Sequence, residues 1–278
     1  MPPQEPQVPS RVLAHTLLTH PGRSPQQWLL VLHGIFGAGR NWRTVASQLV
    51  QVRPDWGVIL VDLRMHGDSQ GFPPPYTLRT AAADLAALLN ATGLRAPGML
   101  GHSFGAKVAL QYAADYPRDL RQVWIVDATP SAGEPAGTAW RMLETVQALP
   151  AVFPSRDGAV AALRRAGFAP EVAQWMATNL EAGDAGYKWK LNFGALRALL
   201  QDYSRTEFWA ALERPPAGIE LHVLKATESD AIDEADEARL RSIASANGRV
   251  VLHRVEGGHW LNVDNRDAIV GLLSRALP

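Results

Sequence analysis

The segment Gly101-His102-Ser103-Phe104-Gly105 has the pattern G-x-S-x-G, in which small residues surround a single serine. An apolar run at 96–100 precedes it, and a helix-forming run at 106–114 follows it. In this context the pattern is typical of a nucleophile elbow, a sharp turn between a strand and a helix that presents the serine hydroxyl above a sheet. The glycines carry no Cβ, so strand and helix can approach closely. We therefore expect Ser103 to be a nucleophile; a glycine-rich turn with an idle serine is the structural alternative.

His259 is the predicted base for this serine. A serine hydroxyl is a poor nucleophile near neutral pH, so it needs a base to accept its proton and a carboxylate to orient that base. Gly257 and Gly258 precede His259 just after the last predicted strand, in a loop flexible enough to bring the imidazole to Ser103. Four of the other histidines lie in or beside predicted strands: His15, His20, His222 and His253. The remaining three lie in loops with other expected roles: His33, His66 and His102.

Two aspartates are candidates for the carboxylate. Asp127 directly follows the apolar run at 123–126, and Asp230 follows the next such run, at 221–224. Both positions lie at the same edge of a parallel sheet, because the carboxyl ends of its strands meet there. The later strand is the commoner place for the acid, but Asp230 lies in a polar, acidic segment that can simply be solvated. Asp127 can equally cap nearby amides, so the residues alone leave both candidates open.

Two backbone amides must stabilise the oxyanion that forms when the serine attacks a carbonyl. One expected donor is the N–H of Phe104, the residue after the nucleophile, and the other lies in the loop after the first buried strand. That loop is His33-Gly34-Ile35-Phe36-Gly37, and we expect the N–H of Ile35 to be the second donor.

The apolar runs before these residues predict a parallel sheet. Residues 12–19 alternate and predict an early strand. Short apolar runs typical of strands buried on both faces follow at 28–32, 58–61, 96–100 and 123–126. Helical patterns at 41–52 and 78–89 separate them. Strands that alternate with helices through short links indicate an α/β fold, a mostly parallel sheet covered by helices on both faces.

This alternation stops between residues 131 and 216. Amphipathic stretches in this segment predict helices, and no run in it is typical of a strand. Strands and helices resume at 221–224, 232–246, 250–255 and 267–277. The chain is therefore expected to divide into an α/β core, residues 1–130 and 217–278, and a helical cap, residues 131–216, inserted after the sixth strand. Such a cap would lie over the carboxyl ends of the strands, where α/β sheets bind ligands.

Several other reactive side chains favour structural roles. Asp62, Arg64 and His66 could suggest a metal or acid/base site, but we expect a loop that hydrogen bonds of Asp62 and Arg64 hold beneath the elbow. Lys107, one turn into the elbow helix, is expected to anchor a loop or the cap. The aromatic residues of the cap are expected mostly to pack within it, with one or two lining the pocket: Trp140, Trp175, Trp189, Phe193 and Trp209.

Composition excludes several classes of function. Lys plus Arg and Asp plus Glu number 27 each, so no net field favours nucleic acid or an anionic membrane. The chain has no cysteine, which excludes disulfides, thiolate metal sites and a cysteine nucleophile and fits a reducing, cytoplasmic location. Residues 1–10 lack the basic start and apolar centre of a secretory signal and predict a frayed tail. No run approaches the roughly 18 apolar residues of a membrane helix.

Together these motifs resemble the α/β-hydrolase superfamily from about Trp28 onward, and within it the small YbfF-type carboxylesterases. The resemblance rests on the segments 33–37, 62–69, 101–105, 127–130 and 258–260. Lys107 and Asp127, which lies 24 residues beyond Ser103, are its most discriminating members. It implies hydrolysis of short-chain esters or thioesters without a cofactor or metal, by a triad of Ser103, Asp127 and His259, and it favours Asp127 over Asp230. Ala106 after the elbow and a loosely matching cap at 189–193 depart from the pattern and leave the substrate range open.

The expected reaction is therefore the serine hydrolysis of a small-molecule ester. His259 deprotonates Ser103, which attacks the carbonyl, and water then releases the acyl group from the enzyme. The same triad could cleave a C–C bond in a diketone or carry out cofactor-free perhydrolysis. A different class of protein, a non-catalytic receptor of the same fold, would use the covered pocket to bind a ligand. An aspartate nucleophile is disfavoured because the elbow carries serine.

Overall fold

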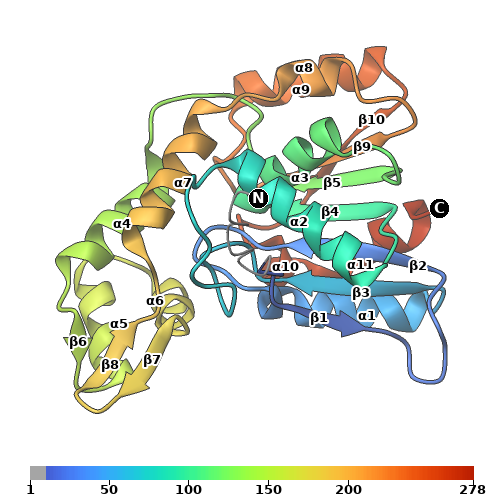
Figure 1. The fold of residues 1–278 in the computed structure, drawn as a ribbon. Coiled ribbons are helices and arrows are strands. Elements are labelled where there is room, and N and C mark those ends of the chain that lie inside the picture. The colour runs from blue at the N-terminus through green and yellow to red at the C-terminus, as the bar shows by residue number, and fades with distance from the viewer. Residues whose placement is uncertain (1–10) are drawn as a thin grey trace, which may run out of the picture.

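A seven-stranded sheet forms the centre of the computed structural model, which describes residues 11–278 (Figure 1). The tail expected at residues 1–10 lies outside the described residues. The strand order is β1-β3-β2-β4-β5-β9-β10; β1 is antiparallel to β3, and every other neighbouring pair is parallel. The strands are β1 (His15–Leu18), β2 (Gln27–Leu32), β3 (Trp56–Val61), β4 (Gly98–His102), β5 (Gln122–Val126), β9 (Glu220–Ala226) and β10 (Val250–Val255). The predicted α/β fold with a mostly parallel sheet is confirmed.

Helices cover both faces of this sheet, and the central strands are apolar for that reason. In β2, Leu30 and Leu32 belong to the core cluster that includes α2, α3 and α9, whereas Leu29 and Val31 belong to the cluster that includes α1 and α11. The helices of the core are η1 (Gly39–Trp42), α1 (Arg43–Val52), α2 (Leu78–Thr92), α3 (Phe104–Asp115), α9 (Glu234–Ala246), α10 (Leu261–Asp264) and α11 (Arg266–Ala276). Both faces of the sheet are therefore removed from water, as the continuous apolar runs predict.

Between β5 and β9 the chain leaves the sheet and forms further elements, all of which lie at the left of Figure 1 except α8, which lies at the top beside α9. These are α4 (Gly137–Ala148), β6 (Val152–Phe153), α5 (Arg156–Arg165), α6 (Pro170–Ala177), β7 (Leu180–Gly183), β8 (Gly186–Trp189), α7 (Phe193–Arg205) and α8 (Trp209–Glu213). The segment that we call the insertion, residues 131–216, follows the fifth strand of the described chain, not the sixth, because the sheet begins at His15 within the described residues.

The insertion is not purely helical, which corrects the expectation from the sequence. Its three short strands form an antiparallel sheet in the order β6-β8-β7. β6 has two residues, and β7 and β8 have four each, so none is long enough to show a period of two in the sequence. Gly186, with a φ of 122°, ends the turn between β7 and β8 in a conformation that favours glycine.

Two side-chain contacts place the insertion against loops that follow strands of the core. Asn179, after α6, donates to the carbonyl of Phe36, which follows β2. Lys190, after β8, pairs with Asp68, which follows β3, at 2.5 Å. The insertion therefore lies over the carboxyl ends of these strands, the edge where parallel sheets bind ligands.

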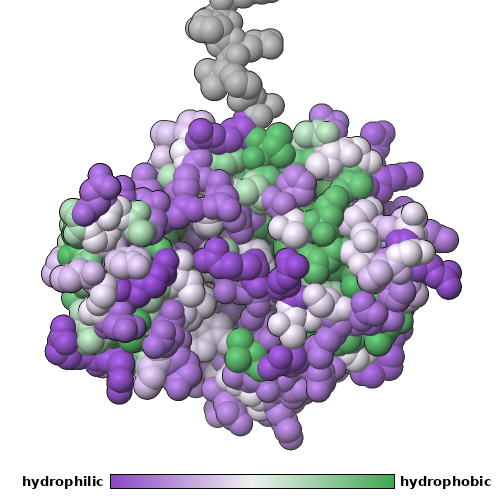
Figure 2. Space-filling model, turned by 90° about the horizontal axis from the view of Figure 1, so that it is seen from below, coloured by the Kyte–Doolittle hydropathy of each residue, from purple (hydrophilic) through white to green (hydrophobic). Residues whose placement is uncertain are grey.

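The surface of the core is largely polar on the side that Figure 2 shows, with apolar side chains gathered in a few patches among charged ones. Among residues 11–278, no helix combines the length and the apolar character that a membrane crossing requires.

Candidate active site

Ser103 lies at the sharp turn between β4 and α3. Its φ of 51° and ψ of −115° are unusual for a residue with a side chain, and such strain is held in place only where the surroundings over-determine it. The Ser103 amide donates to the carbonyl of Val126 at 2.9 Å, which ties the turn to the end of β5. The elbow predicted from the sequence is present, and it presents Ser103 at the carboxyl edge of the sheet.

The two glycines of the elbow are required by close backbone contacts. A Cβ on Gly101 would lie 2.2 Å from the carbonyl oxygen of Gly105, and a Cβ on Gly105 would lie 2.6 Å from that of His33. Real Cβ atoms do not approach backbone atoms so closely, so strand and helix could not pack in this way around larger residues. The pattern G-x-S-x-G thus follows from the packing of β4, α3 and the end of β2.

His259 and Asp127 form the second part of the site. His259 lies in the loop between β10 and α10, and its Nδ1 is 2.7 Å from Oδ2 of Asp127. Asp127 directly follows β5 and is fully buried, whereas the His259 side chain is 35% exposed. A buried carboxylate at Nδ1 fixes the ring orientation and leaves Nε2 free to act as a base.

The environment of Asp127 favours the charged carboxylate. Burial alone would raise its pKa, but the hydrogen bonds from His259 and Ser229 outweigh this effect and hold the pKa below its ordinary value. The Ala226 amide also donates to Oδ1, at 3.1 Å. Asp127 has a φ of 45°, a left-handed conformation that an aspartate adopts more easily than most residues. The carboxylate is therefore both ionised and fixed.

Ser229, a residue that the sequence analysis did not single out, donates its hydroxyl to Oδ2 of Asp127. Its carbonyl accepts a hydrogen bond from the buried ammonium of Lys225, which also donates to the Ala226 carbonyl at 2.7 Å. The signal that could have found Ser229 is its place after β9, at the edge where Asp127 lies. The segment after β9 thus contributes a hydrogen-bond donor to the Asp127 carboxylate.

Asp230, the other candidate acid, is exposed and makes no hydrogen bond to His259 among residues 11–278. Its side chain lines a hollow of about 310 Å³ together with Asp233, Asp236 and Lys107. Of the two aspartates that the sequence left open, the structure brings Asp127 to the histidine.

His102 links the elbow to the His259 loop. Its Nε2 lies 2.7 Å from the His259 carbonyl oxygen, and the two rings are 4.7 Å apart between centroids. Burial, and secondarily the neighbouring His259, lowers the pKa of His102 to about 3, so the ring is neutral near pH 7. Since the carbonyl can only accept, Nε2 of His102 carries the proton. This bond holds the backbone of His259 beside the residue that precedes Ser103.

Within residues 11–278, no hydrogen bond joins the Ser103 hydroxyl to the His259 ring; the rings of His102, the residue before Ser103, and His259 are 4.7 Å apart between centroids. Catalytic hydrogen bonds are often long in the absence of substrate and tighten in the complex. The arrangement places a serine, an oriented imidazole and a buried carboxylate at one edge of the sheet, which are the types of group that acyl transfer requires.

The expected oxyanion donors lie on both sides of the serine. Phe104 is the first residue of α3, and the amides of a first helical turn have no carbonyl partner within the helix. Ile35 belongs to the turn that the Gly37 amide closes on the Gly34 carbonyl at 3.0 Å. A Cβ on Gly34 would lie 3.4 Å from Cβ of Ser103, so this turn runs directly against Ser103. Both amides therefore come from segments that contact Ser103.

The loop after β3 has the structural role that its sequence predicts. Oδ1 of Asp62 accepts from the Gly39 amide and Oδ2 from the Asp68 amide, at 2.7 and 2.8 Å. Arg64 pairs with Asp84 at 2.7 Å. His66 is buried, and burial together with the adjacent His33 lowers its pKa to about 3. These contacts hold the loop in place, and the carboxylate of Asp62 is occupied by backbone donors.

Lys107 anchors the insertion to the elbow helix, as its position predicts. Its buried ammonium donates to the carbonyls of Ser131, Tyr203 and Thr206, at 2.8, 2.9 and 2.7 Å. These acceptors lie near the beginning and the end of the insertion. One cation, one turn after Ser103, therefore ties both ends of the insertion to α3.

Of the aromatic residues in the insertion, Trp175 reaches the site. Its ring centroid is 5.8 Å from that of Trp260, the neighbour of His259. Trp189 and Trp209 are buried, as packing within the insertion predicts. Trp175 thus contacts the loop that carries His259.

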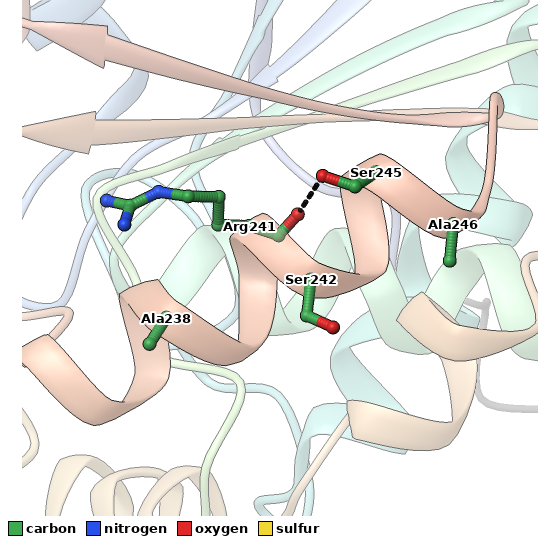
Figure 3. Close-up of a pocket in the computed structure, with 5 residues that line it drawn as sticks. All are labelled: Ala238, Arg241, Ser242, Ser245 and Ala246. Atoms are coloured by element: carbon green, nitrogen blue, oxygen red, sulfur yellow. Dashed lines mark hydrogen bonds between the residues drawn. The ribbon is translucent and has the colours of Figure 1, made fainter.

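A separate hollow lies on the outer side of α9 and contains none of these residues. Ala238, Arg241, Ser242, Ser245 and Ala246 line it (Figure 3). The Ser245 hydroxyl donates to the Arg241 carbonyl at 2.9 Å, so it is already used within the helix. Among the described residues that line this hollow, no serine is paired with a histidine.

Comparisons with known proteins agree with this fold. A family model described as the α/β hydrolase fold matches residues 27–236. The sn-1-specific diacylglycerol lipase ABHD11 of Danio rerio is 30% identical over 65% of this chain and 58% of its own length. The protein of the same name from Mus musculus is 26% identical over 88% of this chain and 80% of its own length. The match thus spans less than two thirds of the Danio rerio protein and four fifths of the Mus musculus protein.

A solved structure of a marine microorganism esterase is similar over nearly the whole chain. It has a TM-score of 0.83, and the superposition covers 96% of this chain and 99% of that one, with 21% identity. At this identity the likeness concerns the fold.

Proposed function

The chain belongs to the α/β-hydrolase family, and we propose that it is a serine hydrolase of small carboxylic esters or thioesters. The observation that carries the proposal is the 2.7 Å contact between Nδ1 of His259 and the buried Asp127, beside an elbow that presents Ser103. A base with a fixed ring and a buried acid is what a serine needs to become a nucleophile.

In the proposed reaction, Nε2 of His259 accepts the hydroxyl proton of Ser103 as Oγ attacks the carbonyl carbon of the ester. Asp127 stabilises the imidazolium that forms, and the amides of Ile35 and Phe104 donate to the oxyanion. The tetrahedral intermediate collapses when His259 returns the proton to the leaving alcohol or thiol, which leaves an acyl group on Ser103. Water, activated by His259, then attacks the acyl carbon and releases the acid.

The proposed substrate binds between the core and the insertion. The insertion lies over the carboxyl ends of β2 and β3, where the turn of Ile35 meets Ser103. The resemblance of the sequence to small carboxylesterases favours esters with short acyl chains. Two relatives are named as diacylglycerol lipases, so longer acyl chains are tested as well. We also propose a cytoplasmic location, which the cysteine-free composition supports.

Hydrolysis of p-nitrophenyl acetate, butyrate and octanoate, and of a diacylglycerol, by the wild type and by Ser103→Ala tests this function. We expect turnover of at least one ester by the wild type and its near-complete loss in the variant. A ring-cleavage diketone assayed in parallel distinguishes C–C bond hydrolysis, and peracid formation from an ester and hydrogen peroxide distinguishes perhydrolysis. A folded wild type that turns over none of these substrates would instead favour the non-catalytic receptor.

A further inference from the structure

We propose that Asn179 is a positioning residue, which holds the turn of Ile35 in the conformation that an oxyanion donor needs. Catalysis then depends on the position of the insertion on the core. The inference rests on the proposed function and adds to it a residue from outside the α/β core. Asn179 lies in the insertion between α6 and β7, whereas the turn of Ile35 belongs to the core and follows β2.

The contact is a hydrogen bond between parts of the chain that are far apart in sequence. Nδ2 of Asn179 donates to the Phe36 carbonyl at 2.9 Å and also lies 3.3 Å from the Met176 carbonyl. Asn179 is 5% exposed, so this amide is a buried polar group with a defined partner in the core. Buried side-chain amides are almost always hydrogen bonded. The partner of this one is Phe36, the residue next to Ile35.

The Phe36 carbonyl depends on this donor. Within residues 11–278, the side chain of Asn179 is the hydrogen-bond partner found for that oxygen. Phe36 is buried and has a φ of 61°, a left-handed conformation that is uncommon for a residue with a large side chain. Strained backbone persists only when its surroundings fix it. The bond from Asn179 is one of these fixing contacts.

The orientation of the Ile35 amide follows from the same turn. Ile35 and Phe36 are its two central residues, and the Gly37 amide closes it on the Gly34 carbonyl at 3.0 Å. If the Phe36 peptide rotates to find water, the turn relaxes and the Ile35 N–H moves relative to Ser103. Oxyanion donors act through preorganised geometry, so a small displacement weakens transition-state binding more than substrate binding.

A matched control lies next to Asn179. The guanidinium of Arg40 donates to the Thr178 carbonyl at 3.3 Å on the exposed side of the same segment. Arg40→Gln weakens the hold of the core on this segment without removing the partner of the Phe36 carbonyl. It separates a general loosening of the insertion from the specific loss of the Asn179 bond.

The test measures ester kcat/KM, and inhibition by a trifluoromethyl ketone and by the corresponding methyl ketone, for wild type, Asn179→Leu, Asn179→Gln and Arg40→Gln. The trifluoromethyl ketone adds to the serine and forms an oxyanion, whereas the methyl ketone reports ground-state binding. For Asn179→Leu we expect kcat/KM and trifluoromethyl ketone affinity to fall together by about 10- to 100-fold, with methyl ketone affinity unchanged. Asn179→Gln, which keeps the amide, should recover part of both losses, and Arg40→Gln should leave both at wild-type values.

Three outcomes would overturn the proposal. They are that Asn179→Leu does not differ from wild type, that its affinity for the two ketones falls equally, and that Arg40→Gln reproduces its effect. Folding is checked by thermal unfolding, and if Asn179→Leu does not fold, Asn179→Ala takes its place in the same comparison. A wild type that hydrolyses no ester and adds to no trifluoromethyl ketone contradicts the proposed function itself, a result that differs from loss in the Asn179 variants alone.

Discussion

Nδ1 of His259 and Oδ2 of Asp127 are 2.7 Å apart, although the two residues are 132 positions apart in the chain. The contact joins the loop after β10 to the residue directly after β5, and β9 lies between these strands in the sheet. The loop after β9 supplies Ser229, which donates to the same carboxylate oxygen. The His259 ring is thus oriented across an intervening strand.

Replacement of Asp127 is expected to abolish most activity. In Asp127→Asn the amide favours the wrong ring orientation or tautomer of His259, and we expect kcat to fall by about 10⁴-fold. Asp230→Asn is the matched control and should keep wild-type activity, because Asp230 is exposed and is not bonded to His259. Steady-state hydrolysis of p-nitrophenyl butyrate measures both. A large loss in Asp230→Asn with little change in Asp127→Asn would reverse the assignment.

Gly105→Ala is expected to destabilise the elbow. The added Cβ would meet backbone oxygens of His33 and Leu32 at 2.6 and 2.7 Å, so β2 and α3 must separate. We expect a loss of about 1 to 3 kcal/mol in the free energy of unfolding, measured by urea denaturation. Gly248→Ala is the control, because a Cβ there meets nothing within 4 Å. Equal stabilities of the two variants would show that the close packing of the elbow is not needed.

Lys107→Met is expected to loosen the insertion. The substitution leaves the carbonyls of Ser131, Tyr203 and Thr206 without their shared donor, and we expect a loss of about 2 to 4 kcal/mol in stability. Limited proteolysis should become faster near residues 131–136 and 203–206. Lys188→Met is the control, because that lysine is exposed and pairs with Glu181. Unchanged cleavage in Lys107→Met would contradict the anchoring role.

The stability of the protein is expected to decrease in acid partly through His66. The folded protein lowers the pKa of this ring to about 3, mainly by burial, whereas the unfolded chain takes up a proton below about pH 6.5. Because the unfolded state then binds more protons, the free energy of unfolding falls as the pH drops from about 6.5.

His66→Asn removes this dependence while its amide can still donate to the Arg64 carbonyl, which His66 Nδ1 contacts at 2.9 Å. We expect the stability difference between wild type and His66→Asn to shift by about 2 to 3 kcal/mol in favour of the variant between pH 7 and pH 4.5. Urea denaturation at both pH values measures it. A difference that is constant with pH would mean that folding does not hinder protonation of His66.

Much of the core could be predicted from the sequence, because its strands are buried on both faces and are read as short apolar runs. The elbow was also predictable, since the packing around Gly101 and Gly105 excludes larger residues. The acid was not decided from the residues alone, because β5 and β9 are neighbours whose carboxyl ends meet at one edge, and both are followed by aspartates. Asp127 differs from Asp230 in directly following its strand, and the family resemblance favours it.

The remaining features depend on contacts that no local pattern records. The strands of the insertion are too short to show a period, so the segment was expected to be helical. Asn179 and Phe36 are 143 residues apart, and nothing in the neighbourhood of either indicates the other. Ser229 directly precedes Asp230, and its contact with Asp127 follows only from the position of Asp127 in the fold.

The most direct test of the account is covalent labelling of the wild type by a fluorophosphonate, followed by peptide mass spectrometry, with Ser103→Ala and His259→Ala as comparisons. An activated serine is required for this reaction. We predict one adduct per chain on Ser103, no adduct in Ser103→Ala and much slower labelling in His259→Ala. A folded wild type that takes up no label, or takes it up at a residue other than Ser103, would contradict the claim that this serine is the nucleophile.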